Sequence, residues 1–548
     1  MRFSPQVKNN TPYNPLVNLT SSNLPIVIIN TNGNQIVDEP KIPADMGIIF
    51  NGDGIQNNIT DPFNNYNSKI GIEIRGSSSQ MFPKKQYGFE TIDITGDDSS
   101  VSLLGFPEES DWILYAPYSD KSLIRNVLLY RLANDIGHYA TRSKFCELIL
   151  NNQYMGIYVL FEKIKRDKNR VNISKIEEKD STGDDLTGGY IIKIDKDEGG
   201  FNAGWFSQFS PYTNAWQRVF YQYDNPDPED ITVPQANYIQ SFIYEFESLM
   251  TSPGFADPLS GYESFIDVNS FIDYFLLNEV SKNVDSYRIS TFMHKNKDSK
   301  GGKLKMGPVW DYNLAFGNSN YFNAWLTEGF HLSFLATDQN IRSFDSFQPP
   351  FWWHKLLNEP SFKSKLNSRW YELRQNQFSI ETIYAYIDSL SSLLNEPKER
   401  NFEQWQILGT EVWPNYFIGD TYEEEITYLK TWIKNRMEWI DKQLTPTSVS
   451  NDKAITDDFI LYQNYPNPFN PVTKFKYTIP SAAIRQGVFV QLKVYDILGN
   501  EITTLVNENK QPGDYEAGFD ASNLSSGIYY YRLTAGNFSE IKKMVLMK

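Results

Sequence analysis

The sequence contains a single cysteine, Cys146, among 548 residues, so no disulfide can form within the chain. The same count excludes a disulfide framework and cysteine-based zinc sites. Histidine is also scarce: the four histidines are His138, His294, His331 and His354. They form neither an HExxH motif nor a close pair, so a zinc hydrolase is not expected.

Positive charge is the next shortage. The formal net charge is −16 and the pI is about 4.9. An acidic chain lacks the basic surface of a nucleic-acid-binding protein and is repelled by anionic membranes. No hydrophobic run approaches the length of a transmembrane helix. We therefore expect neither a nucleic-acid partner nor a membrane span, although a local basic pocket for phosphates stays possible.

Apolar residues are present in quantity, at 40% of the chain with 15% aromatics, which is enough for two or three packed domains. Up to about residue 230 the patterns predict strands and a single helix. The expected strands are 24–29, 70–74, 84–90, 145–150, 154–161 and 190–194, the fourth and fifth forming a hairpin around 151–153. The expected helices are 120–137, 237–250, 269–280 and 423–444.

These patterns divide the chain into four parts. Residues 1–21 form a loose leader, and residues 22–444 form a large α+β domain. In this domain a β-rich part, about 22–200, precedes a helix-rich part, about 230–444. Residues 445–456 are small and polar and predict a linker. Residues 457–548 show short strands at regular spacing, which is typical of an all-β sandwich.

The tail carries several specific motifs. It opens with FILYQNYPNPFNP, continues with VYDILGN and LSSGIY, and ends in KKMVLMK. In these motifs it resembles the type A C-terminal sorting domain of the type IX (Por) secretion system of Bacteroidetes-like bacteria. The resemblance implies export, contact with the type IX machinery, and a secreted or cell-surface location. The alternative is a generic Ig-like adhesion module.

Cargo of that pathway normally carries a signal peptide, but the first residues, MRFSPQVKNNTPYNP, contain no hydrophobic segment. We therefore expect that the start of this sequence is misplaced or truncated.

Two acidic clusters stand out in the large domain, one around Asp285 (NVDSYRIS) and one around Asp311 (GPVWDYNLAFG). The residues between them read as a strand, a turn at 298–302, and a second strand. A hairpin brings Asp285 and Asp311 to neighbouring ends, as a metal–nucleotide site requires. The alternative for both residues is a structural calcium site or a turn-capping role.

These clusters belong to a series of ordered motifs. The others are RGSSS at 75–79, KKQY at 84–87, Trp112 with Ala116, Asp120, Arg125 and Asn126, GIY at 156–158 with Glu162 and Lys163, and GGY at 188–190. Together they resemble the CotH (spore-coat protein H) kinase family. The resemblance implies an atypical protein-kinase-like fold and transfer of the ATP γ-phosphate to Ser or Thr with Mg²⁺. It makes Asp285 the catalytic aspartate, and makes Asp311, Asn313 and Ser290 the metal ligands.

Ser290 stands where many relatives carry Asn, and a hydroxyl binds Mg²⁺ less well than an amide oxygen. The remaining nucleotide contacts implied by the resemblance are Arg75, Ser77, Ser78, Lys84, Lys85, Glu162 and Lys163. The helix at 120–137 takes the αC position but offers no glutamate there, so Asp120 with Arg125 is a substitute pair. The alternatives are a solvated strand edge for Arg75 and Lys84, and a surface ion pair for Glu162 and Lys163.

Two functions remain from this reasoning. The first is a secreted kinase that acts on a surface or co-secreted protein. The second is a catalytically weak pseudokinase that binds glycan or protein at the surface, which Ser290 and the missing glutamate favour. A calcium-dependent hydrolase is disfavoured because no GxSxG motif or histidine-supported triad is present.

Overall fold

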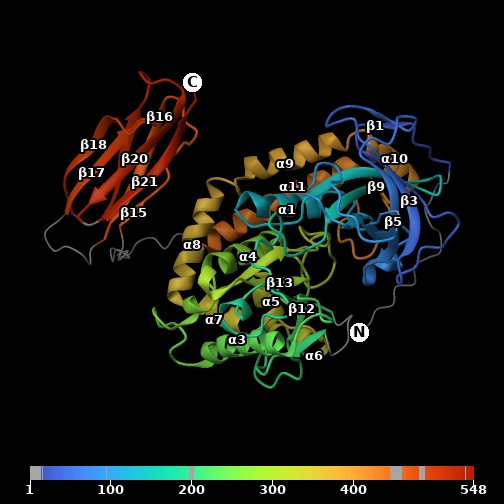
Figure 1. The fold of residues 1–548 in the computed structure, drawn as a ribbon, viewed down its shortest axis with the longest axis horizontal. Coiled ribbons are helices and arrows are strands. Elements are labelled where there is room, and N and C mark those ends of the chain that lie inside the picture. Colours follow the sequence, from blue (N-terminus) through green and yellow to red (C-terminus); the bar gives the residue numbers. More distant parts are fainter. Residues whose placement is uncertain are drawn as a thin grey trace. The chain divides into compact units, whose positions relative to one another are not determined.

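The computed structural model describes residues 14, 16–93, 95–196, 203–444, 459–480, 488–511, 513–536 and 538–547. The chain divides into two compact units, residues 1–446 and 447–548. The expected linker at 445–456 lies outside the described residues. A β-rich region, a helical region and an all-β tail follow one another along the chain, as predicted (Figure 1).

The first unit begins with a closed barrel of seven strands. In order around the barrel the strands are β2 (Ile26–Asn30), β3 (Ile42–Ile49), β5 (Tyr66–Arg75), β6 (Gln86–Thr91), β7 (Asp111–Tyr115), β9 (Gln153–Glu162) and β8 (Ser143–Leu150). A two-stranded sheet, β1 (Ser21–Ser22) with β4 (Asn57–Asn58), stands beside it. Five of these strands were predicted from the sequence, whereas β3, β7 and the closure of the barrel were not. Closure requires the parallel pairing of β2 with β8, more than a hundred residues apart.

The predicted hairpin of β8 and β9 is confirmed. Its turn residues Asn151 and Asn152 have φ of 51° and 65°. Two consecutive positive φ values match the twist of a two-residue hairpin, and asparagine tolerates them better than most residues.

A second, antiparallel sheet has five strands in the order β11 (Gly204–Phe206), β12 (Phe220–Asn225), β10 (Tyr190–Ile194), β13 (Thr291–Lys295) and β14 (Leu304–Val309). The predicted hairpin of β13 and β14 is confirmed. The expected boundary near residue 200 does not separate the sheets, because β10 pairs with β13. Strand β10 therefore belongs with the helical region.

The helical region supplies most of the remaining first unit. Its helices are α3 (Val233–Thr251), α4 (Val268–Ser281), α5 (His331–Thr337), α6 (Gln339–Phe344), α7 (Trp352–Asn358), α8 (Pro360–Arg374), α9 (Ile380–Leu393), α10 (Pro397–Gln404) and α11 (Tyr422–Gln443). Short helix α2 (Gly183–Leu186) precedes β10. Helix α10 packs on barrel strand β9, while α11 packs on α4 and α9 (Figure 1). A single large core runs from barrel residues such as Phe161 to helical residues such as Leu429.

Helix α1 (Arg125–Asp135) is shorter than the predicted 120–137. Leu123 has φ of 66°, a left-handed conformation that an α-helix cannot include. The Asp120 carboxylate instead accepts the backbone N–H of Arg125 at 2.9 Å, so it caps the turn before the helix. The predicted stop at Gly137 is confirmed by its φ of 93° just beyond the helix.

The sequence predicted a loose leader over residues 1–21, but some of these residues are packed against the barrel. Val17 and Leu19 are buried at 6% and 5% exposure in a cluster with Ile26, Ile49 and Ile149. The Asn14 N–H also donates to the Gln404 carbonyl at 3.0 Å. Residues 1–13 and 15 lie outside the described part.

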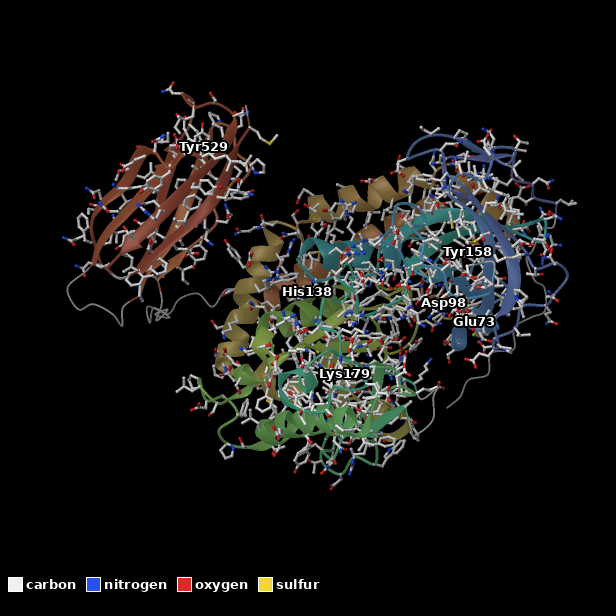
Figure 2. All side chains as sticks on the ribbon, in the orientation of Figure 1. Glu73, Asp98, His138, Tyr158, Lys179 and Tyr529 are labelled. Carbon is white, nitrogen blue, oxygen red and sulfur yellow. The ribbon has the colours of Figure 1, made fainter. Side chains whose placement is uncertain are left out.

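The second unit is an all-β sandwich, as predicted. One sheet holds β15 (Ile460–Leu461), β16 (Val472–Ile479) and β19 (Gly513–Asp520). The other holds β18 (Glu501–Lys510), β17 (Val488–Tyr495), β20 (Gly527–Ala535) and β21 (Phe538–Leu546). The two inner faces share one core, in which the rings of Phe475 and Tyr531 lie 4.4 Å apart. Tyr529 of β20 is labelled in Figure 2.

Among the described residues, no helix is both long and apolar enough to span a bilayer.

Candidate functional site

Asp285 and Asp311 lie at the same end of the β13–β14 hairpin. Asp285 belongs to the segment Asn283–Ser290, which leads from α4 into β13, and Asp311 follows β14. The two segments are joined directly, because the Asn283 side chain donates to the Asp311 carbonyl at 3.0 Å. The hairpin thus brings the two aspartates together, as the sequence predicted for it.

Both segments are backbone-strained. Tyr287, Ser290 and Asp311 have φ of 69°, 49° and 62°. A non-glycine residue in the left-handed region costs on the order of 1 kcal/mol or more and persists only where its surroundings hold it. Such strain clusters at functional sites, which makes this hairpin end the first place to look for chemistry.

A cavity of about 170 Å³ opens at this end of the hairpin. Its lining includes Asp285, Ser290, Asp311 and Asn313, and on another side Arg75, Ser77 and Ser78. Seven of the residues implied by the family resemblance therefore face one space. Three aromatic side chains, Tyr115, Phe161 and Trp310, complete much of the wall.

Asp285 is mostly removed from solvent, with its side chain 17% exposed. Burial raises the pKa of this carboxyl, while Arg288 and Lys196 act to lower it. The Arg288 guanidinium lies 3.6 Å from Asp285 and 2.8 Å from Asp345. It also donates to the Val284 carbonyl at 3.2 Å. Arg288 therefore fixes the position of Asp285 from behind the segment.

The surroundings of Asp311 disfavour its charged form. Burial, and next the charge of Asp285, raise the pKa of Asp311 to about 7, against the opposing effect of Arg75. A buried carboxylate whose pKa is raised by a neighbouring carboxylate is repelled by it. A divalent cation held by Asp311 would offset this repulsion.

Helix α1 holds the Asp311 segment in place. The Asp311 N–H donates to the Tyr130 hydroxyl at 3.2 Å, and the Tyr312 N–H donates to the Asn126 side chain. The Arg125 Nε donates to the Ala315 carbonyl at 3.1 Å. The expected pair of Arg125 with Asp120 is present and buried, at 2.5 Å. It positions the segment from outside the cavity.

The cations of the cavity are Arg75 and Lys196. Arg75 ends strand β5, and its guanidinium lies 5.7 Å from the centre of the Trp310 ring. The chain then turns through Gly76, with φ of 98°, where an added Cβ would lie 2.2 Å from the Ser79 hydroxyl. The positive φ therefore favours glycine at this turn, and Ser77 and Ser78 are exposed.

Four predicted nucleotide contacts do not line this cavity. The Lys84 Nζ is buried and donates to the Ile157 carbonyl at 2.7 Å and to Asn401 at 2.9 Å. Lys85 donates to the Gln80 carbonyl at 2.5 Å. Both ammonium groups are bonded to protein acceptors and neither lysine lines the cavity, so the structure does not support the prediction that either reaches the phosphates.

Glu162 is a similar correction. Its carboxylate has no exposed surface and pairs with Arg142 at 3.0 Å and Arg170 at 3.1 Å. It does not line the cavity, while Lys163 is exposed at the surface. Neither the expected ligand role nor the expected Glu162–Lys163 pair is seen.

The sequence reasoning missed Asp195 and Lys196, which line the cavity. They follow β10, whose last residue, Ile194, pairs with Thr291 at the start of β13. This pairing places them beside Ser290. The signal available in the sequence was the polar run that follows the predicted strand 190–194, but its partner strand lies about a hundred residues away.

In the part of the chain that the structure describes, no group of three His, Cys, Asp or Glu side chains forms a preassembled metal site. A cation here would draw on the Asp311 carboxylate with neutral oxygens such as those of Asn313 and Ser290. Mg²⁺ accepts this kind of ligand set, because it usually binds one or two carboxylates and takes its other ligands from water and phosphate.

Two family models match the chain. Residues 463–547 match a model described as a secretion system C-terminal sorting domain, which implies secretion or cell-surface attachment of this protein. A search of curated proteins found no match. Residues 72–440, about two thirds of the chain, match the model described as CotH kinase protein. They include the barrel strands from β6 onward, the hairpin and both aspartates. The chain therefore belongs to the CotH kinase protein family.

Proposed function

We propose that this protein is a secreted or cell-surface kinase that transfers the γ-phosphate of ATP to Ser or Thr of a surface or co-secreted protein. The observation that carries the proposal is the shared cavity: Asp285 and Asp311 face it from the hairpin, opposite Arg75 and the Gly76–Ser79 turn. In this proposal the barrel acts as the small lobe of a kinase-like fold, and the helical region acts as the large lobe.

Phosphoryl transfer asks a protein mainly for positioning and charge stabilisation. Asp285 accepts the proton of the acceptor hydroxyl, since its pKa is raised by burial and Arg288 fixes its position. Arg75 and Lys196 bind phosphate oxygens, and the backbone of the 76–79 turn adds N–H donors. The aromatic wall excludes water from the reacting groups.

The cavity suits Mg²⁺ at Asp311, with Asn313 and Ser290 as further ligands. Burial and the neighbouring Asp285 raise the pKa of Asp311, so a cation stabilises the charged form of this carboxyl. When bound, the metal neutralises charge on the phosphates. The protein's own contribution is to hold the Asp311 backbone through Tyr130 and Asn283.

Export through the type IX pathway is the second half of the proposal. The sandwich of residues 459–547 provides the sorting domain, and its contact with the secretion machinery follows from the family match.

The kinase is tested with purified full-length protein, Mg²⁺ and radiolabelled ATP, measuring both binding and transfer. We expect Asp285→Ala to bind ATP·Mg²⁺ but to lose at least about 100-fold in transfer, as is typical when a proton-accepting group is removed. Asp311→Ala should lose both metal-dependent binding and transfer. The matched control is Asp98→Ala, an exposed carboxylate of the barrel unit that does not line the cavity (Figure 2). Unchanged transfer in both cavity variants, or no ATP binding by the wild type, overturns the proposal.

A second candidate is a pseudokinase that binds nucleotide, glycan or protein without transferring phosphate. It is favoured by Ser290 in place of asparagine and by the placement of Lys84 and Glu162 outside the cavity. It predicts thermal stabilisation by ATP·Mg²⁺ or a glycan, with no phosphate incorporated into any acceptor.

A further inference from the structure

A second cavity, of about 270 Å³, is lined in part by strand β14. Its lining shares no residue with the first cavity, although Val309 of one and Trp310 of the other are consecutive. The wall is formed by α4, by the hairpin β13–β14, and by two loops that carry His138 and Arg170. His138 is labelled in Figure 2.

The interior of this cavity is mainly apolar. The side chains of Tyr274, Leu277, Met306 and Val309 that line it are all buried, at 3% exposure or less. An apolar cavity of about 150 Å³ is large enough to bind benzene. The larger volume here suits a two-ring group.

The formal charges that line the cavity are paired with protein groups. Arg170, 1% exposed, pairs with Glu162 at 3.1 Å and Glu109 at 3.5 Å. His138 lies 2.7 Å from Asp273, and at the more exposed rim Lys305 lies 3.4 Å from Asp267. A charged ligand would disturb these pairs, so the cavity favours an uncharged one.

One polar group on the wall, His294, is placed to bind a ligand. His294 has its Nδ1 3.1 Å from the Gly307 carbonyl, so Nδ1 carries the proton and Nε2 is an acceptor. Burial lowers the pKa of His294 to about 4, which keeps the imidazole neutral.

We propose that this second cavity is a binding site for a small, uncharged aromatic compound whose edge carries a hydrogen-bond donor, such as a lactam N–H. The ligand's donor pairs with His294 Nε2. The rings pack against Leu277 and Met306. The inference does not depend on kinase activity, because it rests on the second cavity alone.

The test uses two bicyclic probes on the full-length protein, followed by ligand-observed NMR and calorimetry. Isoquinolin-1-one carries adjacent N–H and C=O groups, whereas isoquinoline lacks the donor. For about eleven heavy atoms we expect the lactam to bind with a Kd on the order of 0.1–1 mM. Isoquinoline should bind about tenfold more weakly. No binding of the lactam, or equal binding of both probes, refutes the proposal.

Two variants locate the site. Leu277→Trp fills the cavity and should abolish binding of both probes. His294→Asn keeps a donor to the Gly307 carbonyl but removes the Nε2 acceptor, so lactam affinity should fall about tenfold to the level of isoquinoline. This second variant decides the matter if the first fails to fold. Lactam binding that is unchanged in His294→Asn, or that is displaced by ATP·Mg²⁺, overturns the assignment, because the two cavities share no lining residue.

Discussion

The buried ion pair between Arg436 of α11 and Glu279 of α4 offers the sharpest test of how the hairpin site is supported. Both side chains are fully buried, and Nη2 of Arg436 lies 3.0 Å from Oε2 of Glu279. Arg436 also donates to the carbonyls of Thr327 and Gly329 at 3.0 and 2.8 Å. Glu279 in turn accepts the hydroxyl of Tyr287, within the Asp285 segment, at 3.1 Å.

Removing one partner of a buried pair leaves the other charge uncompensated, which costs about 3–5 kcal/mol. We expect this loss in the free energy of unfolding for Arg436→Met. Glu279→Gln keeps an acceptor oxygen but leaves the guanidinium charge unpaired, so its cost should be similar. The double variant buries neither charge, and we expect it to be at least about 2 kcal/mol more stable than the sum of the single losses predicts.

The assay is denaturant unfolding followed by tryptophan fluorescence. All 12 tryptophans lie between residues 112 and 439, so the signal reports the first unit and is silent for the sandwich. Lys434→Met is the matched control. Lys434 lies on the same helix, but its side chain is 53% exposed, so removing its charge should change the free energy of unfolding by less than about 0.5 kcal/mol. A loss below about 1 kcal/mol for Arg436→Met, or strict additivity in the cycle, would refute this reasoning.

Three further predictions follow from individual contacts. Gly317→Ala should destabilise the first unit by several kcal/mol, because Gly317 has φ of 74° and an added Cβ would lie 2.4 Å from the Trp432 ring. Gly137 is the control, since it has a comparable φ but open space around it. Gly137→Ala should cost only about 1 kcal/mol in the same unfolding assay. Burial lowers the pKa of Lys84 from 10.5 to about 7, so the unfolded chain binds a proton that the folded chain does not between these values. Unfolding free energy should therefore rise from pH 7 toward pH 10.5, and the wild-type and Lys84→Met curves should diverge over this window. Arg75→Met should weaken ATP·Mg²⁺ binding about 10- to 100-fold in calorimetry.

The local parts of the candidate site could be predicted from the sequence. The alternating runs around the turn at 298–302 predict the hairpin β13–β14, and a hairpin necessarily returns Asp311 to the end where Asp285 lies. The strained backbone at Ser290 and Asp311 could not be read from residue types, because neither is a glycine.

The distant parts could not be predicted. The position of the Lys84 ammonium depends on Asn401 of α10, which is 317 residues further along the chain. The Lys84 Nζ donates to the Asn401 side chain and is thereby held between the barrel and α10. Asp195 joins the site only because β10 pairs with β13. Barrel closure likewise depends on a pairing between β2 and β8 that strand patterns do not specify.

In the proposed kinase, burial also bears on which cation binds phosphate at the cavity wall. Burial lowers the pKa of Lys84 to about 7, so a fully enclosed lysine is readily neutralised. Arginine resists neutralisation because its guanidinium is delocalised and more weakly hydrated. Beside Asp311, whose own charge is disfavoured by burial, a cation that stays protonated is needed at the cavity wall. Arg75, at the end of β5 and over the Trp310 ring, meets that need from the strand that leads into the serine-rich turn.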